Sequence, residues 1–155
     1  MIFVDTSAFY ALACETDEAH PRALVIHERL KREGTPFLTT NYVMLETVSL
    51  IQRRHGVACA ERVSDAATEH TELVWIDADQ HHAAWRMWKA QRKRELSVVD
   101  CACFVVMRER GIRAAFSFDE QFRAAGFALV EERPADRVEE PRARYRVRRA
   151  HGRIT

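Results

Sequence analysis

The first dozen residues place an acidic side chain where a buried strand ends and a helix begins. Ile2, Phe3 and Val4 form a short apolar run without Gly or Pro, a composition typical of a strand buried on both faces. The run ends at Asp5, and good helix formers follow at residues 8–12. Ligands of open parallel α/β sheets bind at the carboxyl ends of strands, so Asp5 is a candidate site residue. The alternative is that Asp5 only caps the next helix.

The same order of strand and helix continues along the chain. Further strands are predicted at 36–40, 72–77, 114–118 and 127–130. Helices are predicted at 21–33, 42–55, 57–70, 79–92, 98–110 and 120–125. Strands that alternate with helices predict an α/β fold with a central parallel sheet covered by helices. Asn41 is expected to cap the helix that follows it, and Trp85 and Trp88 are expected in the core.

Cysteine usage and hydropathy indicate the compartment. The four cysteines form no C-x-x-C pair and no cluster with zinc spacing, so free thiols in a reducing compartment are expected. Asp5 interrupts the N-terminal apolar run at once, which excludes a signal peptide of the usual form. No apolar run approaches the roughly 18 residues that a membrane-spanning helix needs. We therefore expect a cytoplasmic protein that does not contact a membrane.

Four acidic residues are expected at one edge of the sheet. Asp5 and Asp119 each follow a strand, Asp100 lies in the first turn of a helix, and Glu46 lies in the second turn of another. Strand ends and the starts of the following helices share one edge, so all four carboxylates could face one crevice. There they would repel and raise each other's pKa, and a divalent cation would remove that conflict. Oxygen-only ligation selects Mg²⁺ or Mn²⁺, which predicts phosphodiester hydrolysis.

Simpler explanations exist for two of these acids. Asp100 stands three residues after Ser97, which is the spacing of a capping box, although Glu or Gln is the usual partner. Glu46 lies on a largely apolar stripe, where its carboxylate needs a partner or a cation unless it reaches water at the boundary of the core.

The motifs around these acids resemble one known family, the PIN-domain nucleases, and within it the VapC-type toxins of toxin–antitoxin pairs. The matching segments are 4–7 (VDTS), Glu46 in a mid-chain helix, 96–101 (LSVVDC), 116–122 (FSFDEQF) and 126–127 (GF). The resemblance covers about residues 1–130. It implies a PIN-like three-layer α/β/α fold and a metal-dependent ribonuclease.

The resemblance also assigns roles. It implies Asp5, Glu46, Asp100 and Asp119 as the catalytic acids, with Asp5 and Asp100 as direct metal ligands. Thr6 or Ser7 would orient the metal site or a phosphate. The implied partners are an RNA substrate, a second copy of the chain in a homodimer, and a cognate antitoxin that keeps the toxin silent.

Other classes fit the sequence less well. A haloacid-dehalogenase-like phosphatase needs a second Asp two residues after the first, where this chain has Ser7. A dinucleotide-binding fold needs Gly-x-Gly-x-x-Gly after the first strand, and no glycine occurs before Gly34. A catalytically silent PIN-like module for RNA binding or scaffolding is the remaining alternative, and the presence of all four acids argues against it.

The C-terminal end differs in charge from the rest of the chain. Residues 133–155 contain eight Arg and three acidic residues, whereas the preceding part carries a net charge of −4. We expect residues 1–132 to form the nuclease domain and 133–155 to be a flexible basic extension. That extension could be only a disordered end, or could hold RNA phosphates or an acidic antitoxin segment. The alternating Arg residues at 142–148 could also form an edge strand.

Overall fold

The structure is a computed structural model, and it describes residues 1–134 and 136. Five short strands form its sheet, in the spatial order β3-β2-β1-β4-β5, and every neighbouring pair is parallel. Their bounds are β1 Ile2–Val4, β2 Phe37–Thr40, β3 Thr71–Val74, β4 Ala114–Phe116 and β5 Ala128–Leu129. The predicted α/β class with a central parallel sheet is confirmed.

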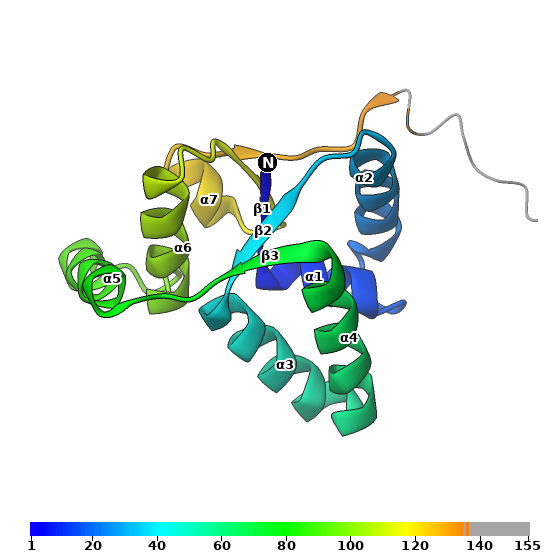
Figure 1. Ribbon diagram of the computed structural model, residues 1–155, viewed down its shortest axis with the longest axis horizontal. Coiled ribbons are helices and arrows are strands. Elements are labelled where there is room, and N and C mark those ends of the chain that lie inside the picture. Colours follow the sequence, from blue (N-terminus) through cyan, green and yellow to red (C-terminus); the bar gives the residue numbers. More distant parts are fainter. Residues whose placement is uncertain (135, 137–155) are drawn as a thin grey trace, which may run out of the picture.

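Seven helices connect the strands of the described chain. They are α1 Thr6–Ala13, α2 His20–Arg32, α3 Asn41–His55, α4 Val57–His70, α5 Ala78–Gln91, α6 Val98–Glu109 and α7 Glu120–Ala124. In Figure 1, α5, α6 and α7 lie on one side of the strands, and α1, α2 and α4 lie on the other. Helix α3 contacts helices of both layers, so it crosses the edge where β1 and β2 end.

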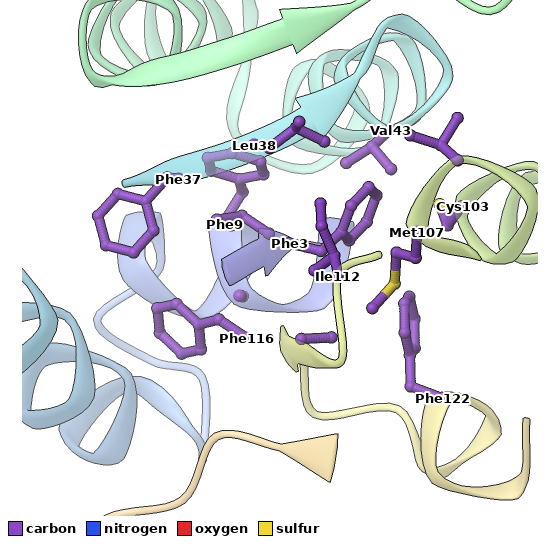
Figure 2. Close-up of a cluster of buried hydrophobic side chains, with 14 of the residues drawn as sticks. Phe3, Phe9, Phe37, Leu38, Val43, Cys103, Met107, Ile112, Phe116 and Phe122 are labelled. Carbon is purple, nitrogen blue, oxygen red and sulfur yellow. The ribbon is translucent and has the colours of Figure 1, made fainter. Parts of the chain in front are cut away.

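The core consists of aromatic and aliphatic side chains between the sheet and these layers (Figure 2). Phe3 of the central strand is fully buried, and its ring lies 6.1 Å from that of Phe122 in α7. Phe122 in turn packs edge-on against Phe104 of α6, at 5.1 Å between ring centroids. Burying such rings stabilises the fold by about 2–3 kcal/mol each. The N-terminal strand is therefore anchored firmly, and Asp5 at its end is held in a fixed place.

Two sequence expectations about side chains are wrong. Asn41 does not cap α3, because Thr40 does so, with its side chain accepting from the Val43 backbone N–H. The Asn41 side chain instead accepts from the Ile76 backbone N–H at 2.8 Å. Trp85 and Trp88 are not core residues, since they remain 38% and 37% exposed on the flank of α5. Helical spacing puts them on one face, but the buried face of α5 is centred on Ala84.

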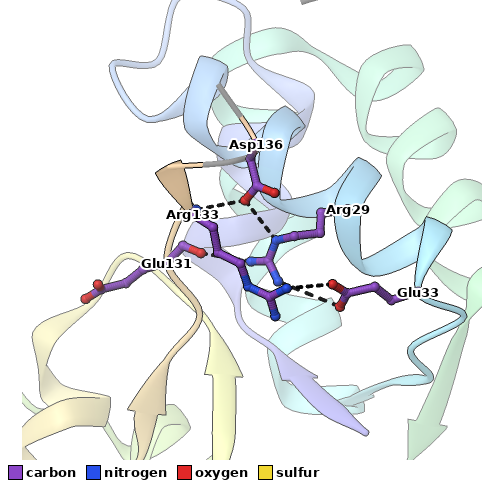
Figure 3. Close-up of polar contacts among 5 residues, drawn as sticks. All are labelled: Arg29, Glu33, Glu131, Arg133 and Asp136. Carbon is purple, nitrogen blue, oxygen red and sulfur yellow. Dashed lines mark hydrogen bonds and ion pairs between the residues drawn. The ribbon is translucent and has the colours of Figure 1, made fainter. Parts of the chain in front are cut away.

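The last described residues are fastened to α2 by a buried arginine (Figure 3). Arg29 Nε donates to Asp136 Oδ2 at 2.9 Å, and its Nη2 donates to the Glu131 carbonyl at 2.8 Å. Asp136 also accepts from the Arg133 backbone N–H, and Arg133 pairs with Glu33 at 2.9 Å. Glu131, Arg133 and Asp136 thus contact α2 and its C-cap Glu33. The rest of the predicted basic extension, 137–155 with residue 135, lies outside the described residues.

None of the described helices combines the length and the apolar character that a membrane-spanning helix requires.

Candidate active site

All four predicted acids line one open cleft of about 670 Å³. Asp5 directly follows β1, and Asp119 follows β4, the strand paired with β1. Glu46 comes from α3 and Asp100 from the first turn of α6. Four elements that are far apart in the sequence therefore bring their carboxylates to the carboxyl edge of the parallel sheet, where ligands of such sheets bind. Thr6 and Ser7 line the same cleft.

Asp5 both caps α1 and faces the cleft. Its Oδ2 accepts hydrogen bonds from the Ser7 backbone N–H at 3.1 Å, from Ser7 Oγ at 2.7 Å and from Ser117 Oγ at 3.0 Å. Burial raises the pKa of Asp5 above its usual value, and the hydrogen bonds from the serines oppose that rise. Asp5 therefore caps α1, as the capping explanation predicts, and its carboxylate also lines the cleft.

Asp100 forms a complete capping box with Ser97. Asp100 Oδ2 accepts from the Ser97 backbone N–H and from Ser97 Oγ, each at 2.7 Å, while Ser97 Oγ accepts from the Asp100 backbone N–H. The pKa of Asp100 is raised to about 6, mainly by burial, with smaller contributions from the charges of Asp5 and Asp119. The predicted repulsion between the acids contributes to this rise in pKa, and desolvation is its larger cause.

Glu46 is held by a hydrogen bond that the sequence did not predict. Thr6 Oγ1 donates to Glu46 Oε2 at 2.7 Å, which links the start of α1 to α3. Glu46 is an exposed residue, so its carboxylate is not placed on a buried apolar stripe and reaches water from the wall of the cleft. Because Glu46 lies at the boundary of the core, water solvates its charge, as the simpler explanation predicts. Its side chain also lines the cleft.

Two serines connect Asp5 to the segment that carries Asp119. Ser7 Oγ lies 3.1 Å from Ser117 Oγ and accepts from the Phe118 backbone N–H at 2.9 Å. Ser117 Oγ accepts from the Asp119 backbone N–H at 3.0 Å, and Asp119 Oδ1 caps α7 through the Gln121 N–H at 2.8 Å. This network fixes the spacing of the two strand ends.

Each of the four carboxylates uses a single oxygen for these bonds. In the described chain, no hydrogen bond is made by Asp5 Oδ1, Asp100 Oδ1, Asp119 Oδ2 or Glu46 Oε1. Four free carboxylate oxygens without a thiolate or imidazole are a donor set that suits a hard divalent cation. The residues therefore fit such an ion chemically. Within residues 1–134 and 136, however, no three acidic, His or Cys side chains are close enough to enclose one.

The cleft also contains residues that sequence reasoning missed. Ser117 directly follows β4 and stands two residues before Asp119, and this position could have identified it as a residue of the site. Tyr10, Arg53 and Arg54 also line the cleft, and the two arginines come from the last turn of α3, whereas Glu46 comes from its second turn. The helical spacing of the two arginines from Glu46 was the available signal.

Comparison with known proteins now identifies the family. Residues 2–128 match the PIN domain. The chain is 41% identical over 138 residues to the 23S rRNA-specific endonuclease VapC20 of Mycobacterium tuberculosis, an alignment that spans 86% of this chain and 99% of that protein. The chain belongs to the PIN-domain family. The resemblance of the acidic motifs to PIN-domain nucleases of the VapC type is thereby confirmed.

Solved structures agree with this assignment. The crystal structure of M. tuberculosis VapC20, described as a Sarcin-Ricin loop cleaving toxin, superposes on this PIN-domain protein with a TM-score of 0.74 at 36% identity. That alignment covers 84% of this chain and 99% of VapC20. PAE2754 from Pyrobaculum aerophilum matches with a TM-score of 0.58 at 18% identity over 83% of this chain and 88% of its own, which shows the shared fold alone.

These relationships confirm the expected enzyme class, a ribonuclease with the function of a toxin. Nucleases with a PIN domain use divalent metal ions, and toxins of this type act on RNA and have an antitoxin as partner.

Proposed function

We propose that this PIN-domain protein cuts a phosphodiester bond in a loop of ribosomal RNA, with Asp5, Glu46, Asp100 and Asp119 as its catalytic acids. The observation that carries the proposal is the convergence of these four side chains on one cleft, each with one carboxylate oxygen free. The choice of RNA rests on the similarity to VapC20, which is named for 23S rRNA and for the Sarcin-Ricin loop.

We infer Mg²⁺ or Mn²⁺ as the ion, with Asp5 and Asp100 as its direct ligands. These two are the buried members of the quartet, and the serines orient both of them. A divalent cation held there would supply an activated water and would neutralise charge that develops on the phosphate. Glu46 and Asp119, at the wall and rim of the cleft, would orient the attacking water or accept its proton. Thr6 holds Glu46 in position, and Ser7 holds Asp5.

The oxygen-only donor set makes the site selective for hard ions. It offers no thiolate or imidazole ligand for a softer, redox-active metal. The two thiols of α6 that are influenced by these charges, Cys101 and Cys103, are both fully buried. Burial raises the pKa of Cys101 to about 11 and that of Cys103 well above its usual value, and both thiols are out of contact with solvent, which argues against either as a nucleophile.

The proposed partners are a second copy of the chain and a cognate antitoxin. The described surface exposes large apolar side chains on and beside α3 and α5, with Leu45 70% exposed and Trp75 73% exposed. Trp85 and Trp88 extend this apolar face. Exposed aromatic and aliphatic side chains of this kind favour a protein interface, and we assign them to the homodimer. Light scattering of wild type and of Leu45→Glu tests this: the variant should have half the mass.

The compartment that fits this function is the cytoplasm, where ribosomal RNA is found. All four cysteines are free, as expected for a reducing compartment.

The proposed substrate can be tested with two short RNAs. One carries the Sarcin-Ricin stem-loop of 23S rRNA, and the other has the same stem with a scrambled loop. Purified protein with Mg²⁺ or Mn²⁺ should cut the first at one position and leave the second intact. Equal cutting of both RNAs would show that the loop sequence is not what this enzyme recognises.

A further inference from the structure

The cleft that holds the four carboxylates is also lined by two arginines. Arg53 and Arg54 come from the last turn of α3 and line the same cleft as the carboxylates. They follow Glu46 by seven and eight residues, so they lie on the same side of the helix and about 10–12 Å along it. The arginines therefore enter the cleft about two helical turns beyond Glu46.

Arg54 is held in a defined position by an aromatic ring. Its Cζ lies 5.2 Å from the centroid of Tyr10 in α1. The Tyr10 hydroxyl lies 3.2 Å from His55 Nε2, and Cys14 Sγ lies 2.8 Å from the same nitrogen. These contacts join the end of α1 to the end of α3. The guanidinium thus lies over a ring that is itself held by His55, an arrangement that Arg favours over Lys.

Neither arginine forms an ion pair within the described residues, although the charge of Asp17 attracts Arg54. No ion pair in the described part of the chain involves Arg53 or Arg54, although Arg29, Arg110, Arg123 and Arg133 all have one. Asp17 also lines the cleft, and its Oδ1 already accepts from the Ala19 backbone N–H. Tyr10 is the main neighbour of Arg54 and accepts a hydrogen bond from it, and the two guanidinium groups line the open cleft without a carboxylate in an ion pair. A planar guanidinium matches the oxygens of a phosphate.

We propose that Arg53 and Arg54 form a subsite for a backbone phosphate that flanks the bond to be cut. Tyr10 acts as a positioning residue that presents Arg54 to this phosphate. The subsite draws the RNA across the cleft, so that the bond to be cut comes to lie over the four carboxylates. This inference rests on the proposed function, since it names the part of the RNA that another part of the same cleft binds.

A structural alternative makes different predictions. Cations in the last turn of a helix stabilise it through the helix dipole, and Arg53 and Arg54 are placed to do so in α3. A dipole role depends on charge alone, so Arg54→Lys would preserve it. Recognition of a phosphate by the planar guanidinium of Arg54 would be lost with lysine, whose ammonium group cannot donate two parallel hydrogen bonds.

The experiment measures binding without cleavage. A fluorescein-labelled 12-nucleotide single-stranded RNA is titrated in EDTA with the full-length protein and with Arg53→Gln, Arg54→Gln, the double variant and Arg54→Lys. The control is Arg113→Gln, an exposed arginine next to β4 at the opposite edge of the sheet. Affinity is measured at several salt concentrations, because each lost phosphate contact reduces the salt slope by about 0.7 for single strands.

The double variant should bind about tenfold more weakly with a shallower salt slope, and Arg54→Lys should recover less than half of the loss. Arg113→Gln should bind like wild type. RNAs that carry one neutral methylphosphonate linkage add a second readout. At one position this linkage should weaken binding by wild type and have no effect on the double variant. Equal affinities and slopes for wild type and the double variant, or full recovery with Arg54→Lys, would overturn the subsite.

Failure of the subsite can be told from failure of the proposed function. Cleavage of the stem-loop RNA with a divalent ion tests the function, and it does not depend on the binding measurement in EDTA. If the function and the subsite are both correct, the double variant should raise KM with little change in kcat.

Discussion

Thr6 Oγ1 donates a 2.7 Å hydrogen bond to Glu46 Oε2, and so the first turn of α1 positions an acid of α3 from 40 residues away. Glu46 is exposed, and Thr6 is its only hydrogen-bond donor in the described chain. Without this bond the side chain would sample several rotamers in water. The bond therefore contributes order more than stability.

The first prediction follows from this pair. Thr6→Val keeps the shape of the side chain and removes the donor, so kcat/KM for the RNA should fall about tenfold, as expected for one hydrogen bond to a charged group. Thr6→Ser retains the donor and serves as the control. Activity of Thr6→Val equal to that of wild type would mean that Glu46 needs no positioning.

The second prediction concerns pH and the stability of the metal-free protein. The pKa of Asp100 is raised to about 6 in the folded state, so the folded protein binds this proton more tightly than the unfolded chain does. The contribution of Asp100 to the free energy of unfolding is therefore greatest below about pH 4, and it is lost as the pH rises through about 6. The shift corresponds to a loss on the order of 3 kcal/mol.

Asp100→Asn should remove much of this pH dependence, because the amide oxygen can still accept from Ser97 and carries no charge. In EDTA at pH 7.5 the variant should unfold at a higher denaturant concentration than wild type. The exposed Asp79→Asn serves as the control and should change little. If Asp100→Asn unfolds more easily, the carboxylate acts chiefly as a cap for α6.

The third prediction separates two roles at the C-terminal end. A chain that ends at residue 133 lacks Asp136 and leaves the buried Arg29 without that carboxylate, whereas a chain that ends at residue 138 keeps the pair. Removing one partner of a buried pair is strongly destabilising, and here about 2 kcal/mol is expected because Arg29 retains the Glu131 carbonyl. Thermal unfolding should show the loss in the shorter chain only.

The chain that ends at residue 138 also tests the basic extension. If the arginines beyond it hold RNA through charge, this chain should bind RNA more weakly than the full-length protein and with a shallower salt dependence. It should keep its turnover at saturating RNA. Unchanged affinity and slope would exclude the extension from RNA binding.

The fourth prediction concerns toxicity. Expression of the chain without an antitoxin should arrest growth, and Asp119→Ala should relieve the arrest because it removes an acid from the cleft. Protein levels must be matched by immunoblot. Normal growth with the wild-type chain in several hosts would contradict the role as a toxin, whatever its activity in vitro.

The sequence predicted the architecture because its signals are local. Strand runs such as Ile2–Val4 end at a charged residue, and glycines such as Gly56, with φ of +85°, end helices where a left-handed residue is needed. The four acids could be placed at one edge because parallel topology determines where strand ends meet.

What could not be predicted depends on contacts between distant segments. The Thr6–Glu46 bond joins residues 40 apart, and the Ser7–Ser117 contact joins residues 110 apart. The exposed position of Trp85 depends on where α5 packs against α6, which periodicity alone does not determine. Arg53 and Arg54 look like ordinary surface charge until the cleft is seen.

The most direct test of the central claim is RNA cleavage by wild type, Asp5→Asn and Asp100→Asn, with Mg²⁺, with Mn²⁺ and with EDTA. The account predicts cleavage by wild type with either ion, none in EDTA, and a loss of at least about 100-fold in both variants, because amides are poor ligands for hard cations. Both variants should remain folded by circular dichroism. Undiminished cleavage by either folded variant, or cleavage by wild type in EDTA, would contradict the assignment of these carboxylates as the metal-binding core of the enzyme.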